Sequence, residues 1–178
     1  MKLLKATVFC LLVAFSANTE MYAQKFSKLD KSPMDAVAFP TSSKDTNKTM
    51  KVIYSRPQLN GRALSDLAPL GKVWRTGANE STEITFYKDF HFGDTPVKAG
   101  TYSLFAIPGE KTWTLILNKD LNAWGAYSYN ADNDVARYTA LVSIDAESIE
   151  AFSIGFDAQG TMVLAWDTTR VSMPFRVE

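Results

Sequence analysis

The sequence predicts an all-β domain, an antiparallel β-sandwich or jelly-roll-like barrel of roughly nine to ten strands. From residue 51 onward, short segments rich in Val, Ile, Thr, Tyr, Phe and Trp alternate with turn residues, which is typical of strands. No segment has the apolar periodicity of a long amphipathic helix. Parallel strands need crossover connections of about a dozen residues or more, so the short connections here favour antiparallel pairing.

The first half of the domain contains expected strands that alternate in polarity and end at turns. Ile84 and Phe86 alternate with polar residues, which predicts one buried face for their strand. The segment 108–111 begins with Pro108-Gly109 and is typical of a hairpin loop. In this half we expect strands at residues 51–55, 73–76, 82–87, 101–107 and 112–118.

The second half continues the same pattern to the C-terminus. The polar segment 157–160 separates two apolar runs and predicts a second hairpin. Pro174 cannot donate a backbone hydrogen bond, so its strand is expected at the edge of a sheet. In this half we expect strands at residues 125–129, 137–144, 149–156, 161–166 and 169–177.

The N-terminal segment has the pattern of a cleavable signal peptide, residues 1–23. A basic start precedes the apolar run 6–17. A membrane span needs about 20 apolar residues, so this run is too short to be an anchor. Cleavage after Ala23 would remove Cys10, the only cysteine, and leave a thiol-free protein without a transmembrane anchor. We therefore expect export to the periplasm or the extracellular space.

The segment 24–50 is polar and is expected to be a flexible lead-in to a single β domain, residues 51–178. Residues 42–49 are nearly free of apolar side chains. Residues 32–38 could form one short helical turn.

The charge pattern and the catalytic motifs exclude several functions. The chain has 19 basic and 19 acidic residues and no block of like charge, so we expect no nucleic-acid partner. His91 is the only histidine, which excludes a metal site with two histidines within one chain. The chain has no P-loop, no dinucleotide fingerprint and no nucleophile elbow. We therefore expect neither a cofactor nor a metal.

Three stretches concentrate polar and aromatic side chains beside glycines. Arginine binds carboxylates or phosphates through paired hydrogen bonds, aromatic rings offer flat faces, and amides offer donors and acceptors. A structural interpretation is also open, in which the arginines pair with acids inside the domain and the tryptophans fill the core. The candidate ligand-binding residues are Tyr54, Arg56, Trp74, Arg75, Asn79, Glu80, Asn118, Asp120 and Trp124.

Five short motifs occur in a fixed order along the chain. They are Tyr54-Ser55-Arg56-Pro57 and the segments 71–80 (GKVWRTGANE), 99–105 (AGTYSLF), 107–109 (IPG) and 118–120 (NKD). Together they resemble the family of domains of unknown function numbered 2911, over about residues 51–177. The resemblance implies a secreted or periplasmic bacterial protein and supplies no activity, cofactor or substrate. His91 is not part of the family pattern.

These observations leave three functions open. The preferred hypothesis is a non-catalytic envelope binding module for a small polar ligand, such as a sugar or a carboxylate, or for a partner protein. The second is a hydrolase that acts on a glycan or another envelope polymer through paired carboxylates such as Glu80 and Asp120. The third is a structural or assembly protein that presents an edge strand near Pro174 to a partner.

Overall fold

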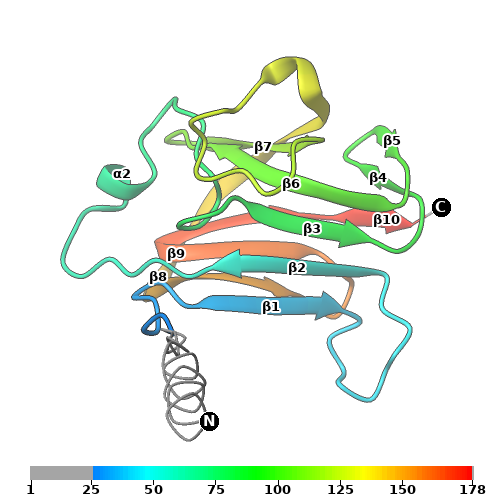
Figure 1. The fold of residues 1–178 in the computed structure, drawn as a ribbon, viewed down its shortest axis with the longest axis horizontal. Helices are drawn as coiled ribbons and strands as arrows, with labels where there is room; N and C mark the ends of the chain where they lie inside the picture. The colour runs from blue at the N-terminus through cyan, green and yellow to red at the C-terminus, as the bar shows by residue number, and fades with distance from the viewer. Residues whose placement is uncertain (1–25, 178) are drawn as a thin grey trace, which may run out of the picture.

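The computed structural model describes residues 26–177, so the predicted signal peptide, its cleavage site and Cys10 lie outside the described residues. The strands are β1 (Met34–Phe39), β2 (Met50–Ser55), β3 (Thr82–Phe86), β4 (Phe90–Phe92), β5 (Thr95–Val97), β6 (Gly100–Ile107), β7 (Thr112–Asn118), β8 (Asp134–Phe156), β9 (Met162–Met173) and β10 (Phe175–Val177). The described part holds two antiparallel sheets, with strand orders β1-β2-β3-β6-β7-β8-β9 and β10-β4-β5 (Figure 1). This architecture confirms the predicted all-β fold class.

The longest strand, β8, bends the seven-stranded sheet. Its first part pairs with β7, from Asn118↔Asp134 to Thr112↔Leu141. Its second part pairs with β9, with register shifts between Ile144 and Ile149 and again before Ser153. Such irregularities bend a strand and increase its twist. The two strands expected at 137–144 and 149–156 are therefore one continuous, bent strand.

The bend brings the end of β8 back to the segment that follows β2. The Leu59 amide donates to the Glu150 carbonyl at 3.0 Å, and the Phe152 amide donates to the Pro57 carbonyl at 2.9 Å. The buried Tyr54 hydroxyl accepts from the Ile154 amide at 3.0 Å and donates to the Ile154 carbonyl at 3.3 Å. Figure 1 shows β8 and β9 running behind β1 and β2. The sheet thus curls around one interior.

Aromatic rings fill the centre of the curled sheet. The Trp74 ring centroid lies 5.9 Å from that of Trp113, 5.1 Å from that of Phe152 and 5.7 Å from that of Trp166. All four side chains are buried. Large aromatic side chains contribute most of the apolar area in a core of this kind. The interior of the fold is therefore a packed core, and any site has to be built at the surface.

Several elements differ from the prediction. Residues 32–38 do not form a helical turn; the segment contains β1, which pairs along β2 in the middle of the expected lead-in. Residues 73–76 and 125–129 are not strands. The first range keeps only the isolated bridge Trp74↔Ala106, and the second is a turn that follows the isolated bridge Glu80↔Trp124. In the part of the chain that the structure describes, the helical elements are the short α2 (Leu64–Leu67) and the 3-10 helix η1 (Ala131–Asn133). In residues 26–177 no helix has both the length and the apolar composition to cross a membrane.

The small sheet explains the position of Pro174. This exposed residue separates β9 from β10, so the chain leaves the large sheet and adds β10 to the edge of the small one. The run 169–177 is therefore two strands, and both lie at sheet edges, as a proline in the run predicts.

Replacing Tyr54 with phenylalanine tests the closure of the sheet. The Tyr54→Phe substitution leaves the Ile154 amide and carbonyl without their buried partner, so the free energy of unfolding should fall by about 1–3 kcal/mol. Urea denaturation followed by circular dichroism measures the change. The control is Tyr87→Phe, at a ring that is 52% exposed, where we expect a change below about 0.5 kcal/mol. Equal effects at the two positions would show that the Tyr54 hydroxyl does not stabilise the closure.

Candidate functional site

Arg56, one of the predicted ligand-binding residues, is fully engaged within the fold. Its Nε donates to the Phe152 carbonyl at 3.1 Å, and its Nη2 donates to the Ser153 hydroxyl at 2.7 Å. Its Nη1 lies 3.1 Å from Oδ2 of Asp35 on β1. This guanidinium ties β1 and the end of β2 to β8, next to the hydrogen bonds of Tyr54. Both residues act in the closure of the sheet.

Asn118 and Asp120 hold the base of the loop 119–133. The buried Asn118 amide group donates to the Asn130 carbonyl at 2.9 Å and to Asp134 Oδ1 at 2.8 Å, and its Oδ1 accepts from the Asp120 amide at 2.9 Å. Both carboxylate oxygens of Asp120 lie 2.9 Å from Asn133 Nδ2. These contacts fix the start of the loop to its end.

A second cluster holds the same loop against the outer face of the sheet. The Tyr129 hydroxyl donates to Asp134 Oδ2 at 2.7 Å, and Arg137 donates to the same oxygen from Nη2 at 2.6 Å. Burial of the phenol raises the pKa of Tyr129 to about 12, and the neighbouring Asp134 carboxylate adds to the increase. The Tyr129 ring packs edge-on against Phe105, at 5.1 Å between centroids. The loop is therefore docked by a small core of its own, which contains Phe105, Ile116 and Ala123.

Backbone hydrogen bonds join this loop to the turn at 73–82. The Gly125 amide donates to the Asn79 carbonyl at 2.9 Å, and the Ser81 amide donates to the Ala123 carbonyl at 2.8 Å. Asn79 has a φ of 59°, a left-handed conformation that asparagine adopts more readily than most residues. Asn79 thus serves the turn through its backbone. The two loops form one rigid unit at the surface.

Arg75 lies where the two loops meet. Its side chain makes no hydrogen bond or ion pair with any other residue that the structure describes, and its Nε is buried. Its backbone carbonyl accepts from the Thr82 amide at 3.1 Å. Gly125 has a φ of +69°, and a Cβ there would lie 3.1 Å from Arg75 Nη1 and 2.8 Å from the Tyr127 ring. The absence of a side chain at Gly125 gives both groups room. The guanidinium borders a surface hollow of about 250 Å³, named the Arg75 hollow, which is lined by Leu67, Pro69, Val73, Trp74, Arg75, Ala126 and Tyr127.

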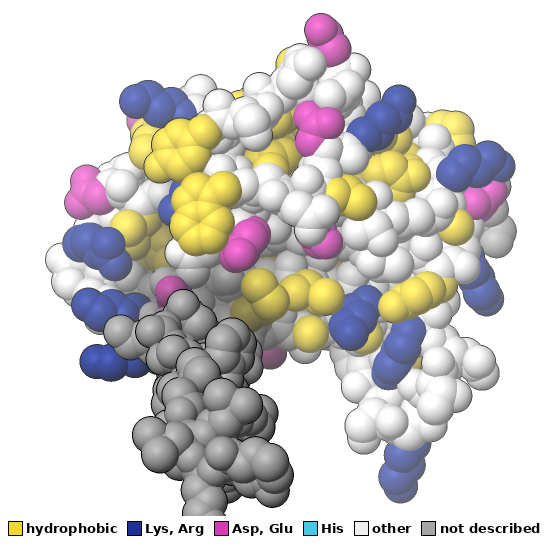
Figure 2. All heavy atoms as spheres, viewed as in Figure 1, with side chains coloured by type: hydrophobic (Ala, Val, Ile, Leu, Met, Phe, Trp, Pro, Cys, Tyr) yellow, Lys and Arg dark blue, Asp and Glu magenta, His cyan; other side chains and the backbone are white. Residues whose placement is uncertain are grey.

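One exposed aromatic ring, Tyr127, lines the Arg75 hollow, and Trp124 lies three positions before it in the same loop. Tyr127 is 86% exposed and Trp124 is 60% exposed, although both belong to a loop that is firmly docked. Figure 2 shows large hydrophobic side chains beside acidic and basic ones on the viewed face, over the loop that follows β7. Of the nine predicted residues, Arg75, Trp124 and Glu80 are therefore the ones with side chains available at this surface. Trp74 is a core residue whose edge reaches the hollow.

Glu80 borders a different hollow, of about 240 Å³, on the other side of the loop. Its carboxylate makes no hydrogen bond or ion pair with another residue of the described part. Glu83 lies in the same hollow and accepts a hydrogen bond from the Asn122 amide at 2.9 Å. We name it the Glu80 hollow; its lining residues are Met34, Ile53, Tyr54, Ser55, Glu80, Ser81, Glu83 and Asn122. The sequence pairs Glu80 with Asp120 as candidate carboxylates, whereas the structure brings it together with Glu83.

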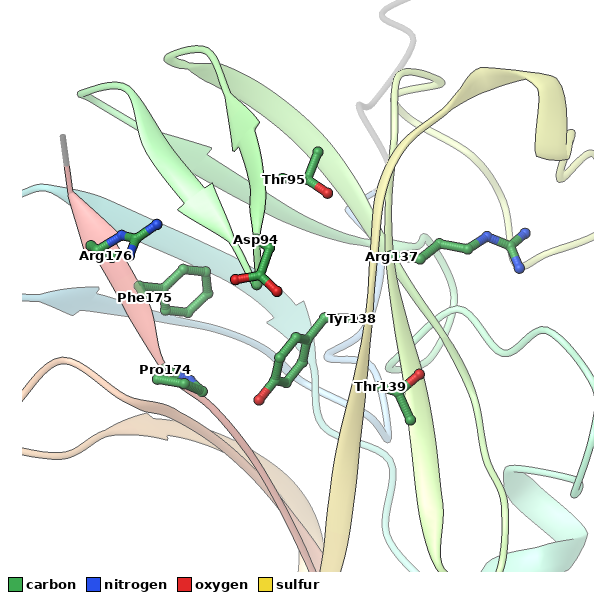
Figure 3. Close-up of a pocket in the computed structure, with 9 residues that line it drawn as sticks. Asp94, Thr95, Arg137, Tyr138, Thr139, Pro174, Phe175 and Arg176 are labelled. Carbon is green, nitrogen blue, oxygen red and sulfur yellow. The ribbon is translucent and has the colours of Figure 1, made fainter.

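A larger hollow, of about 480 Å³, lies between the β4–β5 turn, β8 and β10 (Figure 3). Asp94, Tyr138 and Phe175 face one another across it, and the Arg137 side chain points away from them. None of the nine predicted residues lines it. Arg137 is already held by Asp134. The polar groups at its rim come from three separate elements, so no local sequence motif marks it.

The described residues also limit metal chemistry. Within residues 26–177, no three His, Cys, Asp or Glu side chains are grouped so that they could hold a metal ion.

The residues that the sequence analysis missed are Tyr127 and Glu83. Tyr127 lies in a turn with no flanking motif, and Glu83 is one of the polar residues that alternate along β3. The one sequence signal is Gly125, because a side chain at this position would collide with both the Tyr127 ring and Arg75 Nη1.

The fold and the site define an all-β domain with two hollows, the Arg75 hollow and the Glu80 hollow, beside a pair of interlocked loops. The chain belongs to the family described as "Protein of unknown function (DUF2911)", which matches residues 32–175. The match includes β1 as well as the motifs that resemble this family. Comparison with curated proteins and with solved structures found no match.

The alkaline stability of the protein tests the docking of the loop. Because the pKa of Tyr129 is about 12 in the folded chain and ordinarily about 10, the folded state retains a proton that the unfolded state releases. The contribution of Tyr129 to stability is therefore complete below about pH 10 and is lost as the pH rises through about 12.

Urea denaturation of the wild type and of Tyr129→Phe, at pH 8 and at several values from about 10 to 12, measures this contribution. The difference in the free energy of unfolding between the two proteins should narrow across that interval. Tyr87→Phe controls for removal of an exposed phenol. A difference that stays constant with pH would contradict the raised pKa of the partly buried Tyr129 phenol.

Proposed function

We propose that this protein is an exported, non-catalytic binding module that takes a small anionic ligand in the Arg75 hollow. The observation that supports the proposal is the guanidinium of Arg75, unpartnered among the described residues and with a buried Nε, in a hollow that the exposed ring of Tyr127 also lines. Arg56 and Arg137 both have several acceptors, so Arg75 differs from arginines that serve the fold. A ligand that supplies an acceptor would give this guanidinium, whose buried Nε has no hydrogen-bond partner among the described residues, the partner it lacks.

The free energies favour an anion in this place. A buried donor without a partner costs about 1–3 kcal/mol, and more when it is charged. A carboxylate or phosphate forms short, charge-assisted hydrogen bonds to a guanidinium, often two at once. The rings of Tyr127 and Trp124 offer flat apolar faces on which a ring of the ligand can lie. A carboxylated sugar has both features, and the volume of about 250 Å³ suits a ligand of that size.

The alternative of a hydrolase has less support. It uses Glu80 with a second carboxylate, and the Asp120 carboxylate is held by Asn133. Glu80 and Glu83 share a hollow, but one Glu83 oxygen already accepts from the Asn122 amide. The remaining alternative, an assembly role for the edge near Pro174, is supported by the exposed position of that residue alone. Binding at Arg75 accounts for the buried and unpartnered Nε of Arg75, which neither the hydrolase nor the assembly alternative does.

Export is part of this proposal and predicts the N-terminus of the mature protein. The basic start and the apolar run 6–17 are the features that support it. Expression of the full chain in a bacterium should give a periplasmic or secreted protein that begins at Gln24, which intact mass spectrometry measures. A cytoplasmic protein that retains residues 1–23 would contradict export and leave binding at Arg75 to be judged separately.

Ligand binding is tested with D-glucuronate and D-glucose, which differ in one carboxylate. We expect glucuronate to quench tryptophan fluorescence, through the exposed Trp124, and to bind at least about tenfold more tightly than glucose. Arg75→Met should reduce glucuronate affinity about tenfold or more, because the paired hydrogen bonds are lost. Isothermal titration calorimetry confirms the affinities.

The matched control is Arg176→Met, which removes an exposed arginine at the larger hollow of Figure 3. This variant should bind glucuronate like the wild type. Equal affinities for glucuronate and glucose, or loss of binding in Arg176→Met rather than in Arg75→Met, would overturn the assignment of the site. Urea denaturation of each variant checks that the fold is intact.

A further inference from the structure

Arg75 and Glu80 are two opposite charges in one short turn that do not pair with each other. The residues are five positions apart, and each side chain lacks a hydrogen bond or ion pair to any other described residue. Between them the chain adopts left-handed conformations at Thr76 and Asn79, with φ values of 54° and 59°. The two side chains border different hollows as a result. The turn therefore holds a cation and an anion apart at the same surface.

The segment 122–126 separates the two hollows. Asn122 lines the Glu80 hollow, and Ala126 lines the Arg75 hollow. Trp124 lies between them, bridges Glu80 through its backbone and leaves 60% of its surface exposed. An extended chain covers at most about 3.5 Å per residue, so about 14 Å is the upper limit between the Asn122 and Ala126 Cα atoms. Lining residues of the two hollows therefore lie within the reach of a ligand of two linked rings, with Trp124 between them in the chain.

The Glu80 hollow suits a cationic group that carries N–H donors. Among the described residues that line it there is no Lys, Arg or His, and two of them are glutamates. The Glu80 carboxylate is free to accept, and the Ser55 and Ser81 side chains lie in the same lining. An ammonium group has three donors and a positive charge, and therefore complements this set of acceptors. The Arg75 hollow has the opposite preference, for a carboxylate.

We propose that the ligand is a zwitterionic saccharide, with a carboxylated ring at Arg75 and a second ring that carries a free ammonium group at Glu80. This inference rests on the proposed function, because it assumes that Arg75 binds the anion. The faces of Trp124 and Tyr127 lie against the rings, and the two charges fix the direction in which the saccharide lies. The backbone hydrogen bonds between the two loops fix the two hollows relative to each other before the ligand binds.

The test compares the disaccharide of glucosamine and glucuronic acid, which has a free amino group, with the same disaccharide after N-acetylation. The free-amine probe carries a positive charge, and the N-acetylated probe is neutral at that nitrogen and carries an added acetyl group. Calorimetry at pH 7 and low ionic strength should show about fivefold tighter binding of the free amine, because an ion pair at an exposed carboxylate contributes about 1 kcal/mol at most. The preference should decrease with added salt.

Variants separate the two hollows. Glu80→Gln should remove the preference for the free amine and leave the affinity for D-glucuronate unchanged. The matched control is Glu147→Gln, at an exposed glutamate outside the Glu80 hollow, which should keep the preference. Arg75→Met should weaken both disaccharides. Triglycine, a zwitterion without a ring, tests a peptide as the alternative ligand and should bind more weakly than the free-amine disaccharide.

The outcomes distinguish this inference from the proposed function. If glucuronate binds at Arg75 but the free amine gives no advantage, or if Glu80→Gln keeps the advantage, the zwitterionic ligand is overturned and the anion site remains. If triglycine binds more tightly than the free-amine disaccharide, the saccharide is overturned. If neither glucuronate nor the disaccharides bind, both proposals fail.

Discussion

The course of β8 is the constraint on which the rest of the structure depends. One strand pairs with β7 at its start and with β9 at its end, and hydrogen bonds to Pro57 and Leu59 hold its other edge. The register shifts allow it to bend, because an irregularity in the ladder increases the local twist. This bend brings Phe152 and Trp166 onto Trp74 in one interior. The residue after Trp74 is Arg75, so the core fixes the base of the candidate site.

The parts of the fold that the sequence predicts are those that depend on local pattern. Ile84 and Phe86 alternate with polar residues, and both are buried on one face of β3. β1 escapes prediction because its residues include weak strand formers such as Asp35, and its extended form depends on pairing along β2. The polar stretch 145–148 resembles a turn, but it is an irregularity within β8. Long-range pairing decides both cases, and no short window of sequence contains it.

The roles of side chains in the candidate site also depend on distant segments of the chain, which the local sequence does not reveal. Arg56 and Arg75 have similar settings in sequence, since each lies close after an aromatic residue and before a turn. The difference is that Phe152 and Ser153, about a hundred positions away, supply acceptors to Arg56, and no described residue supplies any to Arg75. Sequence composition can therefore predict a group of arginines and aromatic residues as candidates for ligand binding. Only the contacts made by distant segments separate those that stabilise the fold from those that remain open.

The open charges of Arg75 and Glu80 are not a consequence of a loose surface. Backbone hydrogen bonds from Ser81 and Gly125 hold their turn to the loop 119–133, and that loop is in turn held by Tyr129 and Asn118. A turn that is ordered at this level could pair its two charges at little cost in entropy, yet its left-handed residues direct them apart. Native proteins leave few buried polar groups unsatisfied, so the buried Arg75 Nε calls for an explanation, whereas the exposed Glu80 carboxylate is solvated. An ordered binding site provides one, because a ligand then meets both charges without paying to arrange them.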